Sequence, residues 1–203
     1  MSTLEQKHSF ERAITAIVSS GSKDTESTPN TIDVDSFGRI RVIFHFDEKY
    51  PTSCYIRFTN FSAGDGWGSQ FIPRVNTEVI VNFLNGDPDR PIATGTLYNG
   101  NNKIPKELPN NKTQSYIKTQ SMPGSNSQYN LLLFEDKAQE ELVHIRAQKD
   151  YKLHALHDST INIDHDQTEV VGHDESVSID GYHVGVIYTF LFLFNKYLRA
   201  PLI

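Results

Sequence analysis

Residues 157–180 read HDSTINID-HDQTEVVG-HDESVSID, three successive octads that each begin with His-Asp. One aliphatic position recurs at the same interval, and its members are Ile163, Val171, Ile179 and Ile187. A short fixed period with one apolar position per repeat is typical of a β-helix or a stacked strand-turn array. One octad per layer cannot bury its aliphatic side chain alone. We therefore expect further coils or other chains to cover these residues.

The His-Asp pairs have two interpretations. Stacked along an array, His157, His165 and His173 would form a ladder of imidazoles, which are common ligands of transition metals. Alternatively, His-Asp occupies the turn of each octad, where the aspartate accepts hydrogen bonds from backbone donors. We favour the turn, and so expect no metal ion and no cofactor.

Upstream of the octads the sequence predicts four short strands, at residues 39–46, 54–59, 78–84 and 91–98. Turn signals separate them, for example Asp35-Ser36-Phe37-Gly38 and Asn85-Gly86-Asp87-Pro88-Asp89. Short strands joined by such turns indicate a small barrel or sandwich. We expect its inner face to include Val42, Phe44, Ile56, Phe58, Val79, Val81 and Ile92.

The other segments complete an all-β organisation. Residues 14–18 suit a helix or a strand, and residues 101–128 are rich in Pro, Asn, Lys, Ser and Thr, which is typical of an extended linker. Two strands, at 131–136 and 141–147, then surround a turn. The predicted parts are an N-terminal stub (1–13), a barrel (14–100), a linker (101–128), a β-helical stem (129–187) and a divergent hydrophobic tail (188–203).

Composition narrows the classes of function. The chain has 203 residues, a net charge of -6 and one cysteine. The acidic balance argues against a general binder of nucleic acid or anionic membranes, and a single cysteine excludes an internal disulfide framework and a multi-cysteine zinc site.

The first residues of the sequence lack the apolar core of a signal peptide. The longest apolar stretch, 184–194, is shorter than the about 20 residues that a membrane-spanning helix needs, so we expect no stable membrane anchoring and interpret this stretch as aggregation-prone.

Three features of the barrel region could carry chemistry. Cys54 is either a nucleophile or, as we favour, a small buried hydrophobe. The Gly64-Asp65-Gly66-Trp67-Gly68 loop lacks the Gly-Lys-Ser/Thr of a phosphate cradle, and we expect a tight loop with Trp67 packed across the barrel end. Asp87 and Asp89 could bind calcium or serve acid–base chemistry, but Asp-Pro-Asp before Arg90 is also a plain turn with a local ion pair.

An ordered set of motifs gives this chain a family resemblance. The run Asp35-Ser36-Phe37-Gly38-Arg39-Ile40-Arg41-Val42 opens the set. Further members are Trp67-Gly68, Ile72-Pro73-Arg74, Glu78-Val79-Ile80-Val81, Gly86-Asp87-Pro88-Asp89-Arg90-Pro91, Tyr98-Asn99-Gly100 and Phe134-Glu135-Asp136-Lys137. From about residue 14 to about 187 the chain resembles VgrG, the valine-glycine repeat spike protein of bacterial type VI secretion, which is related to the spikes of contractile phage tails.

The resemblance implies an OB-fold barrel followed by a short trimeric β-helix, with Phe44, Phe58, Trp67, Pro73, Asp87, Asp89 and Arg90 in the core and loops of the barrel. It implies a homotrimer that acts mechanically rather than as an enzyme and helps to puncture target envelopes. Its expected partners are a tube protein at the base, and a tip-capping protein and effectors at the needle end. We expect assembly in the cytoplasm, followed by secretion or injection into the target cell.

The sequence also departs from the family pattern. The family usually has a large hub domain before the barrel, and the chain continues past residue 187 without further octads; our hypothesis is a truncated or frameshifted form. Glycine is usual where Asn76, Tyr116 and Ala138 stand, and a left-handed backbone would be costly for Tyr116 and Ala138.

Two rival functions are an OB-fold module that binds single-stranded nucleic acid or glycan, and a cell-wall hydrolase, for which we find no paired catalytic carboxylates.

Overall fold

The computed structural model describes residues 12–21, 31–46 and 52–181. The chain divides into two units between Lys152 and Leu153. The first unit holds eight strands within the described ranges, and they are β1 (Ile14–Ser19), β2 (Arg41–Phe44), β3 (Arg57–Phe58), β4 (Glu78–Phe83), β5 (Pro91–Leu97), β6 (Gln114–Lys118), β7 (Leu131–Glu135) and β8 (Leu142–Arg146). Within those ranges, no helix has the length and apolar character to cross a membrane. Most of the stub, Ile187, the 184–194 stretch and the tail lie outside the described residues.

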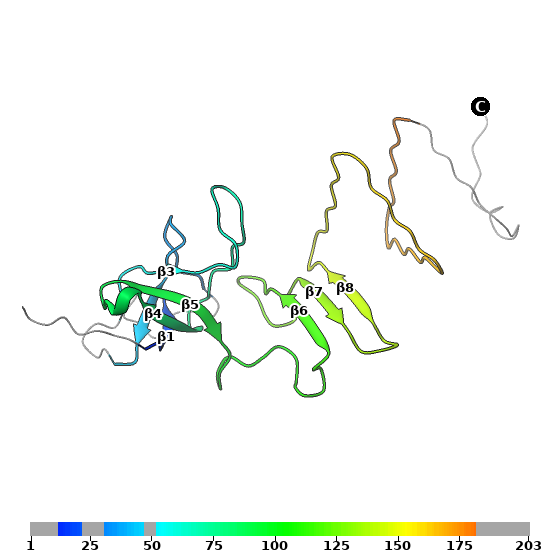
Figure 1. Cartoon of the computed structure of the whole chain (residues 1–203). Helices are drawn as coiled ribbons and strands as arrows, with labels where there is room; N and C mark the ends of the chain where they lie inside the picture. The colour runs from blue at the N-terminus through cyan, green and yellow to red at the C-terminus, as the bar shows by residue number, and fades with distance from the viewer. Residues whose placement is uncertain (1–11, 22–30, 47–51, 182–203) are drawn as a thin grey trace, which may run out of the picture. The chain divides into compact units, whose positions relative to one another are not determined.

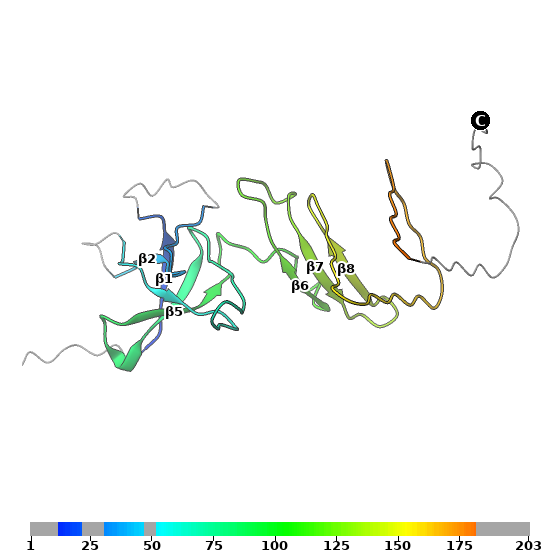
Figure 2. The same cartoon turned by 90° about the horizontal axis from the view of Figure 1, so that it is seen from above.

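The first five strands form one curled sheet in the order β2-β1-β4-β5-β3 (Figures 1 and 2). Residues 14–18, which suited a helix or a strand, lie in β1, between β2 and β4. The two edge strands meet through Ile40 and Ile56, whose backbones exchange hydrogen bonds of 2.9 and 2.8 Å. Because this bridge joins one edge to the other, the sheet curls back on itself, as an OB-type barrel requires.

Small and β-branched side chains fill the inside of this sheet. The buried cluster consists of Ala16, Val18, Ile40, Val42, Ile56, Val79, Val81 and Ala93, with Phe44 and Phe58 packed against it. The prediction was wrong for β5, where Ala93 rather than Ile92 belongs to the core. Paired residues face the same side of a sheet; Ala93 pairs with buried Val81, whereas Ile92 pairs with Asn82. A bulge sets this pairing: Ile80 pairs with Gly95 and Val81 with Ala93, so that Thr94 of β5 has no partner across the ladder.

A second sheet follows, with the antiparallel order β6-β7-β8 (Figure 2). β6 lies inside the span that we interpreted as a linker, since the prolines at 109 and 123 flank rather than interrupt it. Only Leu133 is a buried hydrophobic residue in this sheet. Leu142, Val143 and Ile145 of β8 are exposed; Val143 and Ile145 face one side of the sheet and Leu142 faces the other.

Left-handed backbone occurs at one of the three positions where glycine is usual in the family. Asn76 has a φ of 72°, as expected for a residue that tolerates this region. In the turn between β7 and β8, Gln139 has a φ of 69°, and the neighbouring Ala138 avoids the costly conformation. Tyr116 lies in β6 and pairs with Leu133.

The second unit, described as far as residue 181, runs as extended segments joined by bends (yellow to orange in Figure 1). The bends fall at residues 156–157, 164–165 and 172–173, one per octad. Ile163, Val171 and Ile179 are 50, 45 and 48% exposed, whereas Ile161, Val170 and Val177 are 73, 87 and 70% exposed. The octad position is therefore the more sheltered one, yet half of its surface stays open in a single chain.

Candidate functional site

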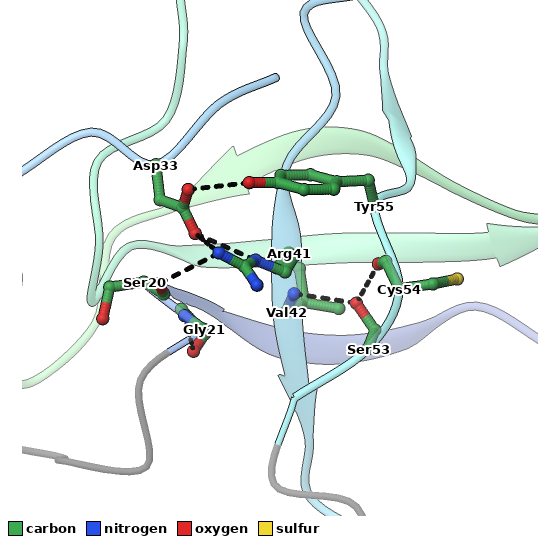
Figure 3. A network of polar contacts seen from close by, with 9 residues as sticks. Ser20, Gly21, Asp33, Arg41, Val42, Ser53, Cys54 and Tyr55 are labelled. Carbon is green, nitrogen blue, oxygen red and sulfur yellow. Dashed lines mark hydrogen bonds and ion pairs between the residues drawn. The ribbon is translucent and has the colours of Figure 1, made fainter.

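A polar clamp holds four segments of the barrel together (Figure 3). Arg41 on β2 donates from Nε and Nη2 to Oδ2 of Asp33 at 3.0 and 2.7 Å, and Nη2 also donates to the carbonyl of Ser20 at 3.1 Å. The hydroxyl of Tyr55 donates to Oδ1 of the same carboxylate at 3.0 Å. The guanidinium also lies over the Tyr55 ring, 4.6 Å from its centroid. One arginine thus connects the end of β1, the 31–35 segment, β2 and the segment that leads into β3.

The contacts of the clamp join segments of the barrel. Both carboxylate oxygens of Asp33 accept hydrogen bonds, Oδ2 from Arg41 and Oδ1 from Tyr55. The hydrogen bond to Asp33, together with burial, raises the pKa of Tyr55 above its ordinary value. The phenol therefore stays protonated and donating at neutral pH. Charge-assisted contacts of this kind fix the relative positions of segments that are distant in sequence.

Gly21 leaves the space that the clamp needs. Its φ is 72°, and a Cβ at this position would lie 2.0 Å from Cζ of Arg41. Gly38 has the same φ of 72° but no atom within 4 Å of its hypothetical Cβ. The two glycines therefore form a matched pair, with equal backbone strain and different surroundings.

We expect Gly21→Ala to destabilise the barrel more than Gly38→Ala. Both changes carry the left-handed backbone cost of about 1–2 kcal/mol. Gly21→Ala additionally displaces the Arg41 guanidinium from Asp33, and losing a hydrogen bond to a charged group costs about 1.5–3 kcal/mol. Urea unfolding of both variants measures the difference. Equal losses would contradict the view that Arg41 holds the barrel through this contact.

The loops that carry the family motifs form turns. In the first, Asp35 accepts hydrogen bonds from the backbone of Phe37 and Arg39, both at 2.9 Å, and pairs with the Arg39 side chain at 2.6 Å. In the second, Oδ1 of Asp87 accepts from the backbone of Asp89 at 3.0 Å. The carbonyl of Asp87 accepts from the backbone of Arg90 at 2.9 Å. The carboxylate of Asp87 thus serves the backbone of its own turn.

The structure corrects two expectations about side chains near these turns. Cys54 is exposed, not buried, because it precedes β3 and the inward alternation seen at Ile56 does not extend to it. Trp67 is also exposed and lies over Gly64 of its own loop rather than across the barrel end. Pro73, by contrast, is buried.

The His-Asp pairs have the same geometry in all three octads. Nδ1 of His157, His165 and His173 lies 2.9, 2.9 and 2.8 Å from Oδ2 of the following aspartate. Each pair is at or next to a bend and is almost fully exposed. Residues 12–21, 31–46 and 52–181 contain no group of three or more His, Cys, Asp or Glu side chains that could hold a metal ion.

A carboxylate in the second sheet links β6 to β7. Glu135 accepts from the Gln114 side chain at 2.9 Å and from the backbone of Lys137 at 3.1 Å. Hydrogen bonds from Thr113 and Gln114 are the main reason why the pKa of Glu135 is lowered. A lowered folded-state pKa means that the stabilisation is complete above the ordinary pKa of about 4.3, and is lost as the pH falls through the lowered value.

We therefore expect Glu135→Gln to make stability less sensitive to acid. At neutral pH the variant should melt below the wild type, because an amide accepts these hydrogen bonds more weakly than a carboxylate. The gap should narrow as the pH falls below about 4.3, since the wild-type carboxylate becomes protonated as the pH passes through its lowered pKa. Thermal melts at a series of pH values provide the measurement. A gap that stays constant would show that Glu135 contributes nothing through its charge.

Comparisons with known proteins cover both parts of the chain. Residues 29–98 match the model of the type VI secretion system and phage-baseplate injector OB domain. Residues 115–187 match the C-terminal trimerisation domain of bacteriophage T4 gp5. The two matches correspond to the curled sheet and to the second sheet with its octads.

Individual relatives show the same likeness. The chain is 42% identical over 137 residues to the type VI secretion system spike protein VgrG5 of Pseudomonas aeruginosa, which is 66% of this chain and 17% of that protein. Identity to VgrG3 of Vibrio cholerae, a spike protein of the same system, is 44% over 130 residues, or 62% of this chain and 13% of the relative. Identity to the actin cross-linking toxin VgrG1 of Vibrio cholerae is 40% over 121 residues, which is 58% of this chain and 11% of that protein. The chain thus spans less than a fifth of the length of these relatives.

Proposed function

This chain belongs to the VgrG family of type VI secretion spike proteins, and we propose on that basis that three copies form part of the spike of a contractile injection apparatus. The proposal rests mainly on the octads. Their aliphatic residues are half-exposed in one chain and fall inside the segment that matches a trimerisation domain. Three chains around an axis would bring these residues together in every layer.

The proposed role is mechanical. Intertwined chains pair their backbone groups in each layer and leave no free strand edge along the stem, so that local unfolding under load is slow. The barrel would form the collar above the stem, held by the Arg41 clamp. No catalytic step is part of this role. One relative is named as a toxin, and that activity belongs to the relative. The region aligned with this chain makes up 11% of that protein.

The proposal includes partners and a location. A tube protein would bind at the base of the collar, and a tip-capping protein and effectors would bind at the end of the needle. The spike would assemble in the cytoplasm and then leave the cell or enter the target with the apparatus. We propose neither nucleic-acid binding nor stable membrane anchoring, in keeping with a net charge of -6.

Sedimentation velocity of the full chain tests the proposal. A trimer whose population falls on dilution is expected, because an obligate oligomer loses stability as its concentration falls. Fluorescence anisotropy with a labelled single-stranded oligonucleotide tests the rival OB-fold binding module, whose affinity would fall steeply with salt. A monomer that binds the oligonucleotide in this manner would overturn the spike proposal.

A further inference from the structure

A groove on the barrel carries arginine side chains that have no partner within the described ranges. Its volume is about 480 Å³. Phe37, Arg39, Cys54, Tyr55, Arg57 and Arg90 line it, and we call it the arginine groove. Arg39 is already paired with Asp35. Arg57 and Arg90 are exposed and form no ion pair or side-chain hydrogen bond with any described residue. Asp89 is the single carboxylate in the lining, so positive charge is in excess there.

The same barrel presents an exposed aromatic loop, residues 61–71, which projects beyond β3 (teal in Figure 1). Phe61, Trp67 and Phe71 on this loop are 85, 68 and 49% exposed. Asp65 lies at its tip, is exposed, and has no ion pair or side-chain hydrogen bond with any residue that the structure describes. The loop thus combines an unpaired carboxylate with aromatic surface that is costly to leave in water.

The aromatic loop is ordered although it is exposed. Gly64 donates its backbone N–H to the carbonyl of Trp67 at 2.9 Å, and Ser69 donates to the carbonyl of Ser62 at 2.9 Å. The Trp67 indole rests on Gly64, where a Cβ would lie 2.2 Å from the ring. A rigid aromatic surface loses little conformational entropy on binding, which favours a role as an interface anchor.

The loop and the groove complement each other in charge and in apolar character. The loop offers one carboxylate and several aromatic rings, and the groove offers two unpaired guanidinium groups and the exposed ring of Phe37. Tryptophan and arginine are enriched at the centres of protein interfaces. Because both features lie on one barrel, a contact from each copy to the next is heterologous, and three such contacts close into a ring when the rotation between copies is threefold.

We propose that the aromatic loop of one copy occupies the arginine groove of the next copy, and that three such contacts close the collar. This inference rests on the proposed trimer. The trimerisation segment would hold three barrels at high effective concentration, so that even a small contact becomes occupied. A second copy fits better than nucleic acid, because the groove is short and the chain is acidic overall, whereas single-strand binders need a long basic track.

Cys54 makes the contact testable, since it is the only cysteine and lines the groove. Gln70→Cys adds an exposed thiol to the aromatic loop and leaves Asp65 in place. A short bismaleimide should then link the two thiols between copies, so that most of the protein migrates as covalent dimers and trimers on a denaturing gel. Thr96→Cys is the control, because it adds an exposed thiol on β5 outside both features.

Alkylation of Cys54 gives a second measurement on the otherwise intact protein. A monofunctional maleimide should react about tenfold faster with the Trp67→Ala chain than with the wild type, as expected for a contact that loses one interface anchor. Arg57→Glu combined with Arg90→Glu should abolish the cross-link of the Gln70→Cys chain, because the new carboxylates would repel Asp65. All of these positions are exposed, so thermal melting should show folded protein.

The outcomes separate this inference from the proposed function. A trimer in which Gln70→Cys links no better than Thr96→Cys overturns the loop-in-groove contact and leaves the spike proposal intact. A monomer at all concentrations overturns both. Protection of Cys54 by a single-stranded oligonucleotide, but not by trimer formation, would also overturn the contact and would assign the groove to nucleic acid.

Discussion

Ile179→Asp is expected to dissociate the stem. Three copies would bring three carboxylates together at one level of the axis, and buried like charges without partners are strongly unfavourable. The lost layer itself contributes about 5–9 kcal/mol, at about 1.5–3 kcal/mol for each of three buried aliphatic side chains. Sedimentation velocity across a range of concentrations should show the trimer replaced by monomer.

Ser178→Asp is the matched control for this change. It adds the same charge one residue earlier, on the opposite side of an extended segment, because successive side chains alternate. We expect the trimer to persist in that variant. Equal dissociation by the two substitutions would show that net charge, and not burial at the octad position, governs assembly. Ile163 and Val171 should respond to aspartate as Ile179 does, since their partial exposure is nearly the same.

Ile40→Ala should cause the largest loss of stability in the barrel. Ile40 is fully buried, and its backbone forms the bridge that joins the two edge strands. Truncating a buried isoleucine to alanine removes apolar contacts and leaves a cavity, which costs about 2–5 kcal/mol. Denaturant unfolding monitored by the fluorescence of Trp67, the single tryptophan, measures the change at a fixed protein concentration.

Ile32→Ala provides the control, since it deletes the same atoms from a side chain that is 38% exposed. Its cost should stay below about 1 kcal/mol, as is usual for positions that keep contact with solvent. A loss at Ile40 no larger than at Ile32 would mean that the edge strands are held by their backbone hydrogen bonds alone, and that the core does not extend to the bridge.

Much of the fold could be predicted from local sequence patterns. Alternation of polar and apolar residues marks β2, and apolar runs mark β4 and β7. The turn after β4 contains residues that suit it, Asn85 and Gly86, with φ of 54 and 70°. The octads are the clearest case, since each repeat bends where the His-Asp pair stands. β6 was missed because flanking prolines gave its surroundings the composition of a linker, although its own five residues pair fully with β7.

The polar clamp around Arg41 could not be predicted from the sequence. Arg41 lies on an alternating strand, where an arginine is an ordinary outward residue. Its partners Ser20, Asp33 and Tyr55 come from three other segments. Gly21 offered one signal, because a glycine directly after an apolar strand marks a turn or a close approach of another group. Which group approaches depends on how the sheet curls.

The sequence by itself determined the all-β class, the octad period with its apolar position, and the family, because each of these depends on short-range order along the chain. Only the tertiary structure decided which side chains face inward at the irregular places. Ala93 replaced Ile92 in the core because Thr94 is left unpaired in β5, and this bulge places Ala93 opposite Val81 of β4. Cys54 and Trp67 are exposed because both lie outside the regular strand, Cys54 before β3 and Trp67 after it. Burial at such positions depends on contacts between distant segments, and alternation within one segment does not carry that information.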